Sequence, residues 1–156
     1  MGRIQVSSSS GIGMGLHGGE WRIHASAVDE SKVIVDALSW LSGGGSEIIT
    51  HKENSTLGAP MQTISVKMRG KQARLSLGML EKESLREILE NDLDKRIDDD
   101  KFLHIRLSLD RLVQGIGALS LNKDEPVAKG KFKLEVYPGQ EAIGVAEKLL
   151  GLSLGD

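Results

Sequence analysis

The chain has 156 residues, 39% hydrophobic and 27% charged, which favours one folded domain over a disordered chain. It contains no cysteine, which excludes disulfides, thiolate nucleophiles and cysteine-ligated metals, and suits a reducing compartment. No apolar run reaches the roughly 20 residues that cross a bilayer. The N-terminus also lacks the apolar stretch of a signal peptide, so we expect a cytoplasmic protein that does not bind membranes.

The formal net charge is −2, but the charges are distributed unevenly along the chain. Residues 81–100 contain nine carboxylates and four bases, which leaves 16 bases and 13 acids, a net of +3, elsewhere. This segregation allows one face of the protein to be basic although the total charge is slightly negative.

Residues 1–19 predict a flexible Ser/Gly-rich N-terminal segment, followed by a single domain over 20–156. Within this segment, Gly13 to Gly18 match the G-x-G-x-x-G pattern of dinucleotide-binding turns. That motif requires a preceding strand and a following helix, whereas here serines precede it and strand-like alternation follows. A nucleotide-dependent enzyme that uses these glycines is therefore the least favoured hypothesis.

Regular structure is predicted to begin at Glu20, where apolar and polar residues alternate as in a half-buried strand. A helix over 30–42 follows, with Asp29 as its N-cap and glycines 43–45 at its end.

The central part of the chain predicts two strands, around 46–52 and over 61–69, and then helical structure. Residues 71–80 are compatible with a short helix. Residues 83–97 predict a longer one, because leucines and isoleucines form a narrow apolar seam on an otherwise charged cylinder.

The last third predicts strands over 103–109, 116–121 and 129–137, followed by a helix over 140–150. Strands joined by short turns favour antiparallel pairing. The sequence therefore predicts an α+β fold, a two-layer sandwich in which helices cover one face of a mostly antiparallel sheet.

The outward positions of these strands carry the candidate binding residues, because helices on one face leave the other face free. They are Arg22, His24, Lys67, Arg69, His104, Arg106, Lys131 and Lys133, with Glu135 as the only acid in the alternating sets. A basic face of this kind predicts contact with phosphates. Ordinary exposed strand residues, or lysines that protect sheet edges from aggregation, are the two alternative explanations.

Aromatic residues make up only 3% of the chain, with Tyr137 and Phe102 as outward candidates. Proteins that bind single strands use exposed aromatic side chains to stack on bases. A basic surface with few aromatics instead predicts contact with the backbone and shape of structured RNA.

No residue pattern indicates catalysis. The four histidines show no short metal-ligand spacing, and the carboxylates of 81–100 fit the solvated face of a helix and its turn. The serines lack the context of a catalytic nucleophile. We therefore expect a protein that is not an enzyme, with no catalytic residues, no metal and no cofactor.

From about Trp21 to Leu150 the chain resembles the archaeal RNA-binding family also described as predicted exosome subunits. The resemblance is carried by the Gly58-Ala59-Pro60 turn, by residues 95–100, by the stretch from Leu103 to Arg111 and by Val136-Tyr137-Pro138. It implies an α+β fold like that of the ribosomal protein that carries 5S rRNA, no enzymatic activity, and an RNA-processing complex as a partner. Arg111, at the end of the Leu103 stretch, joins the candidate RNA-binding residues.

Two hypotheses follow from the sequence. The first is non-catalytic binding of structured RNA through the basic sheet face, as an accessory to RNA processing or the exosome. The second is a protein-interaction module that docks a basic partner through the acidic helix 83–97. Both a monomer and a dimer are compatible with the sequence.

Overall fold

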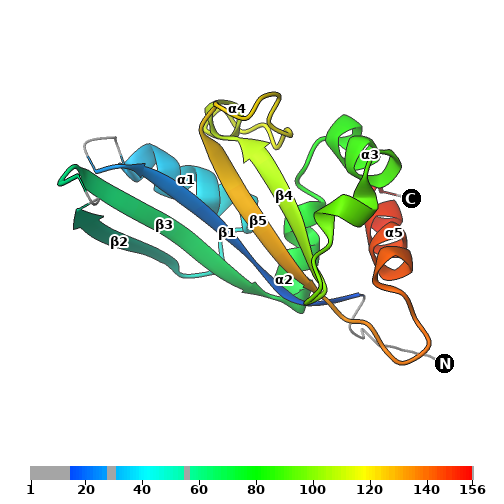
Figure 1. Ribbon diagram of the computed structural model, residues 1–156. Helices are drawn as coiled ribbons and strands as arrows, with labels where there is room; N and C mark the ends of the chain where they lie inside the picture. The colour runs from blue at the N-terminus through cyan, green and yellow to red at the C-terminus, as the bar shows by residue number, and fades with distance from the viewer. Residues whose placement is uncertain (1–14, 28–30, 55–56, 156) are drawn as a thin grey trace.

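The computed structural model describes residues 15–27, 31–54 and 57–155, and its centre is a five-stranded sheet (Figure 1). The strands lie in the order β2-β3-β1-β5-β4, and every neighbouring pair is antiparallel. Their bounds are β1 Leu16–Ser26, β2 Ile48–Asn54, β3 Pro60–Arg69, β4 Phe102–Ser108 and β5 Val127–Leu134.

Helices form the second layer; Figure 1 shows the helices over 31–41 and 70–77 behind the sheet and those over 82–90 and 142–153 to the right of β4. They are α1 Ser31–Leu41, α2 Gly70–Leu77, α3 Lys82–Glu90, the 3-10 turn η2 Leu93–Arg96, the short α4 Leu109–Leu112 and α5 Ala142–Ser153. The predicted α+β fold, with an antiparallel sheet and helices, is confirmed. No helix in the described part of the chain is long and apolar enough to span a membrane.

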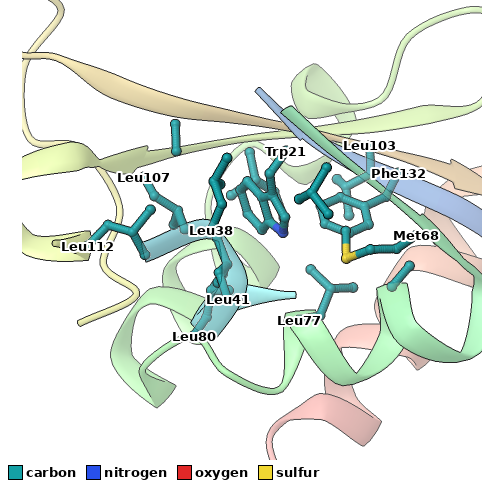
Figure 2. Close-up of a cluster of buried hydrophobic side chains, with 14 of the residues drawn as sticks. Trp21, Leu38, Leu41, Met68, Leu77, Leu80, Leu103, Leu107, Leu112 and Phe132 are labelled. Atoms are coloured by element: carbon teal, nitrogen blue, oxygen red, sulfur yellow. The ribbon is translucent and has the colours of Figure 1, made fainter. Parts of the chain in front are cut away.

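The core lies between the two layers and is centred on Trp21 of β1 (Figure 2). The indole N–H of Trp21 donates a hydrogen bond of 2.7 Å to the Ser76 hydroxyl on α2. Ser76 in turn donates, also at 2.7 Å, to the carbonyl oxygen of Leu41 at the end of α1. This chain satisfies the polar atom of a fully buried Trp and connects β1 to both helices behind it.

Two aromatic side chains fill the space above two glycines at the β1–β5 pair. Trp21 lies directly opposite Gly130, and Phe132 lies directly opposite Gly19. A Cβ at Gly130 would stand 2.5 Å from the Trp21 ring, and one at Gly19 would stand 2.4 Å from the Phe132 ring. The two rings meet edge to face, with 5.2 Å between their centroids. Glycine is therefore required at both positions for this pairing to form.

The strand boundaries differ from the predicted ones at two places. β1 begins at Leu16, so Leu16–Gly19, which we had assigned to the N-terminal segment, belong to the central strand of the sheet. Gly18 lies in this strand and not at the start of a helix, which removes the context that a dinucleotide motif needs. Gly13 and the Asp29 cap lie outside the described residues. The last strand ends at Leu134 and does not reach Tyr137.

The helix predicted over 83–97 is wrong as a single element. α3 ends at Glu90, Asn91 is extended, and Asp92 adopts a left-handed conformation with φ of 58°. The chain then resumes as η2, whose Leu93 is buried. The helical spacing of apolar residues thus continues past the end of α3 into η2. This continuity is why the sequence predicts one long helix. The short helix over 71–80 is confirmed as α2.

The strand predicted over 116–121 is also wrong. This segment makes only isolated bridges, Gly117 to Leu80 and Leu119 to Leu107, the second on the outer edge of β4. The short helix α4, which we had not predicted, precedes it, and the Ser108 hydroxyl accepts the Arg111 N–H at its start.

Glycine at position 130 is predicted to be necessary for stability. Gly130→Ala should lower the free energy of unfolding by about 1–3 kcal/mol, because the new Cβ overlaps the Trp21 ring. Gly144→Ala on α5 is the matched control, because a Cβ there meets nothing within 4 Å. It should leave stability unchanged or raise it by up to about 1 kcal/mol, as helix propensity dictates. Urea denaturation of both variants tests this, and equal stability of the two would contradict the packing account.

Candidate nucleic-acid interface

The eight strand residues proposed from the alternation all lie on the sheet face opposite the helices. Residues directly paired across an antiparallel ladder lie on the same face, so the register decides this. The buried residues of each strand alternate with them and face the core. We call the bases of this surface the basic face: Arg22, Lys67, Arg69, Arg106, Lys129, Lys131 and Lys133.

The basic face is arranged in rows that cross the strands. In one row Arg106 of β4 pairs with Lys129 of β5, which pairs with Arg22 of β1. The next two rows are His104, Lys131, Glu20 and Lys67, and then Phe102, Lys133, Gly18 and Arg69. Because neighbouring strands are roughly 5 Å apart, these bases form a continuous positive surface.

Lys129 was not among the residues proposed from the sequence. It lies on the same face as Lys131 and Lys133, two residues before Lys131 in the same strand, and it is exposed. The alternation of residues over 129–137 already places Lys129 on the same side of the strand as Lys131 and Lys133. His24 also lies on the face, where its Nδ1 is 3.0 Å from the Thr63 hydroxyl.

Arg111 is not brought to the basic face. It lies on α4, and its Nη2 is 3.9 Å from the Glu81 carboxylate, just before α3. Arg111 therefore contacts the helix layer, and a role for it in RNA binding remains a prediction.

The acid at the centre of the basic face is Glu20, and our statement that Glu135 is the only acid in the alternating sets is wrong. Glu20 lies outward on β1 and forms an ion pair of 2.7 Å with Arg22. Glu135 follows the end of β5 and lies 3.5 Å from His17. Within the described residues, Arg22 alone among the seven bases forms an ion pair with a carboxylate.

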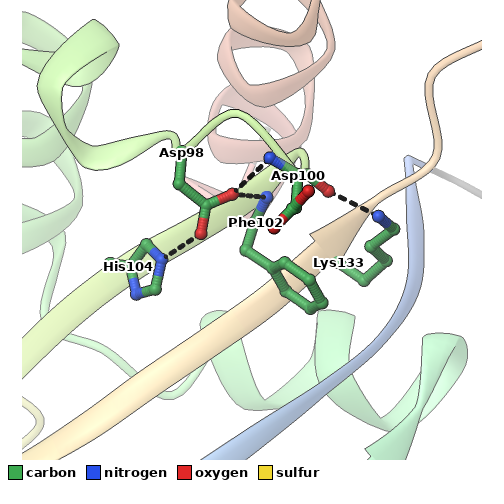
Figure 3. Close-up of polar contacts among 5 residues, drawn as sticks. All are labelled: Asp98, Asp100, Phe102, His104 and Lys133. Atoms are coloured by element: carbon green, nitrogen blue, oxygen red, sulfur yellow. Dashed lines mark hydrogen bonds and ion pairs between the residues drawn. The ribbon is translucent and has the colours of Figure 1, made fainter.

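Phe102, the first residue of β4, contacts two of these lysines. The ammonium groups of Lys131 and Lys133 lie 4.3 Å and 4.7 Å from the centre of its ring. Lys133 also donates a hydrogen bond to the carbonyl oxygen of Asp100 (Figure 3). The ring thus positions cations by cation–π attraction.

Tyr137 is exposed but lies beyond the end of β5. Its hydroxyl hydrogen-bonds to Glu135, which raises the pKa of Tyr137. The Glu135 carboxylate therefore lies beside the Tyr137 ring. Its negative charge would repel the phosphate of a base that stacked on this ring.

Asp98 anchors the acidic turn against the same end of the sheet. One carboxylate oxygen accepts the backbone N–H groups of Asp100 and Phe102 at 2.9 and 3.0 Å, and the other lies 2.7 Å from His104 Nε2 (Figure 3). The hydrogen bond from His104 is the largest cause of the lowered pKa of Asp98, followed by the Phe102 N–H. These hydrogen bonds hold residues 98–100 against the start of β4.

The remaining carboxylates of the acidic stretch lie in the helix layer. Glu83, Glu87 and Glu90 are exposed on α3, away from the open sheet face. In the part of the chain that the structure describes, no three histidine or acidic side chains gather closely enough to hold a metal ion. These three acids therefore add no negative charge to the open sheet face, although Lys82 and Arg86 share α3 with them.

The fold and the site together define an α+β sandwich whose open sheet face carries most of its outward bases in neighbouring rows. The chain belongs to the RNA-binding family, whose sequence model matches residues 20–134 and carries the description RNA binding. The resemblance to an archaeal RNA-binding family is thereby confirmed. Among curated proteins, none matches the sequence.

Solved structures of archaeal proteins share the fold. A DUF54 protein from Archaeoglobus fulgidus is 25% identical, with a TM-score of 0.71, and the alignment covers 86% of this chain and 99% of that one. A DUF54 protein from Methanothermobacter thermautotrophicus is 17% identical, with a TM-score of 0.65 and 90% and 98% covered. One from Sulfolobus solfataricus is 14% identical, with a TM-score of 0.66 and 87% and 96% covered.

The Asp98–His104 contact makes a prediction about acid titration. A lowered pKa means that Asp98 stabilises the folded protein above its usual value of 3.8, and that this contribution is lost as the pH falls through the lowered value. His104→Ala should raise the pKa of Asp98 toward 3.8. His24→Ala should not change it, because His24 contacts Thr63 instead. Carboxyl chemical shifts measured by NMR against pH test this, and an unchanged Asp98 in His104→Ala would refute it.

Proposed function

We propose that the protein binds structured RNA through the basic face and acts by binding, without a chemical step. The observation that supports this most is the convergence of seven bases from four strands onto one surface, with Glu20 as the acid among them and the other outward acid, Glu53, at the far end of β2. Random exposed strand residues would mix both signs of charge. Lysines that only protect a sheet edge would concentrate on β2 and β4, whereas Arg22 and Lys131 lie on the interior strands β1 and β5.

The preference for structured RNA follows from the chemistry of this surface. Phosphates attract arginine and lysine, whereas unpaired bases need aromatic rings to stack on. Phe102, the aromatic residue on the outward side of β4, lies against two lysine ammonium groups. A surface built in this way favours the phosphates and shape of a folded duplex.

The placement of the bases also favours one orientation of the bound RNA. On α3 the bases Lys82 and Arg86 alternate with Glu83, Glu87 and Glu90, whereas the sheet face groups its bases in rows, so the sheet face is the better surface for RNA. The helices then remain free to contact a protein. We extend the proposal to an accessory role in RNA processing or degradation with the exosome as the partner, on the basis of the resemblance described above.

Binding is predicted to depend on phosphate contacts made by the basic face. Lys129→Ala or Lys131→Ala should weaken the affinity for an RNA hairpin and flatten its dependence on salt by roughly one unit of the log–log slope or less, because each phosphate contact releases counterions. Lys148→Ala on α5 removes the same charge from the helix layer and should leave binding unchanged. Fluorescence anisotropy of a hairpin and of an unstructured strand at several salt concentrations measures this, and the hairpin should bind more tightly.

Two outcomes would overturn the proposal. One is the absence of RNA binding at low salt. The other is binding that Lys129→Ala and Lys131→Ala leave unchanged. If Glu87→Gln or Glu90→Gln instead abolished capture of a basic protein partner, the acidic-helix hypothesis would replace the present one, since these substitutions should leave RNA binding unchanged or slightly tighter.

A further inference from the structure

A small open pocket of about 250 Å³ lies beside the outer edge of β4. It is lined by Arg96 from η2, Arg106 from β4 and residues 119–123, including Lys123. Its lining contains no carboxylate. Pockets for drug-sized molecules usually measure roughly 300–1,000 Å³, so this one suits a smaller group.

The pocket exists because two separate segments cover the edge of β4. Ile97, directly after η2, bridges to Leu103 near the start of the strand. Leu119 bridges to Leu107 near its end, and the Ser120 N–H donates at 3.0 Å to the carbonyl oxygen of Arg106. Arg106 lies between these two covering segments, so its side chain is shared by the pocket and the basic face.

The loop that carries Lys123 is held in place by its own hydrogen bonds. The Asn122 side chain accepts the backbone N–H groups of Asp124 and Glu125 at 3.0 and 2.9 Å. The Glu125 carboxylate accepts the N–H of Asn122 in return, at 3.2 Å. The Glu125 carboxylate is thereby turned to the backbone, and neither it nor Asp124 lines the pocket.

Three cations from three different segments therefore converge without a counterion. Among the described residues, none of Arg96, Arg106 and Lys123 forms an ion pair. The Nε of Arg96 is buried and has no hydrogen-bond partner there. Like charges repel, and a buried donor without a partner is costly, so this arrangement favours a bound anion that accepts hydrogen bonds.

We propose that this pocket binds one phosphate group of the RNA at the point where the RNA crosses the β4 edge. This inference rests on the proposed function. Arginine guanidinium groups suit a tetrahedral phosphate because they donate two parallel hydrogen bonds, and Lys123 adds a point charge. The pocket continues the row of Arg106, Lys129 and Arg22, so a backbone that follows this row reaches the pocket.

The test uses Arg96→Gln and Lys123→Gln in the full-length protein, with Lys148→Gln as the matched control on α5. Neither pocket variant removes a base of the sheet face. Each should weaken hairpin binding about tenfold at low salt, the loss expected for one charge-assisted hydrogen bond, and flatten the salt slope. Lys148→Gln should change neither. Lys123 is exposed on a loop, so its variant remains informative if Arg96→Gln fails to fold.

Hairpins with a 5′-monophosphate and with a 5′-hydroxyl distinguish the two sources of the phosphate. If the pocket variants weaken both hairpins equally, the pocket holds an internal phosphodiester. If only the phosphorylated hairpin loses affinity, the pocket holds the terminal group. Either result supports the proposal.

Two results would overturn it, and they are distinguishable. If Lys129→Ala weakens binding while Arg96→Gln and Lys123→Gln match Lys148→Gln, the pocket does not bind RNA and the basic face alone does. If the wild-type protein binds no hairpin at low salt, the pocket proposal and the proposed function both fail.

Discussion

The packing of Trp21 over Gly130 and of Phe132 over Gly19 holds the two central strands, β1 and β5, in one register. Side chains on a strand alternate between the two faces, so a shift of one residue would turn every core residue outward and every base inward. Arg22 follows Trp21, and Lys131 lies between Gly130 and Phe132. The contacts that bury the aromatic rings are therefore also the contacts that place the bases on the open face. β3 and β4 then pair with these two strands and bring their own bases into the same rows.

The local arrangement of charge explains how a protein with a net charge of −2 can present a basic surface. Seven bases share three neighbouring rows of the sheet with one acid, Glu20, which pairs with Arg22. The exposed acids Glu83, Glu87 and Glu90 lie on α3 instead, beside Lys82 and Arg86. A polyanion responds to such a local excess of bases rather than to the total charge.

Much of the basic face could be predicted from the sequence, because strand alternation assigns each residue to a face without further information. Arg22, Lys67 and Lys131 were found in this way. Lys129 was missed because it stands first in the predicted strand 129–137, whereas β5 begins at Val127. The outward position of Glu20 was missed for the same reason, since the alternation was counted from Trp21.

The features that depend on tertiary structure could not be predicted in the same way. The apolar seam of 83–97 concealed the left-handed turn at Asp92, because buried apolar residues continue across it, with Ile88 before the turn and Leu93 after it. The pocket depends on two segments, 96–97 and 119–123, that are distant in sequence and meet only along the edge of β4. The pattern in 116–121 resembles a strand because Leu119 does bridge to β4, although no ladder forms. No local pattern brings Arg96, Arg106 and Lys123 together.

Lysine footprinting in the presence of RNA tests the central claim most directly, because lysines occur on both layers of the same molecule. The protein is acetylated with and without a saturating hairpin, and the modification of each lysine is measured by mass spectrometry. The account predicts that RNA protects Lys67, Lys129, Lys131 and Lys133 on the sheet face, while Lys82 on α3 and Lys148 on α5 react as before. Protection of Lys82 and Lys148, with the sheet lysines unchanged, would place the RNA on the helix layer and contradict the account.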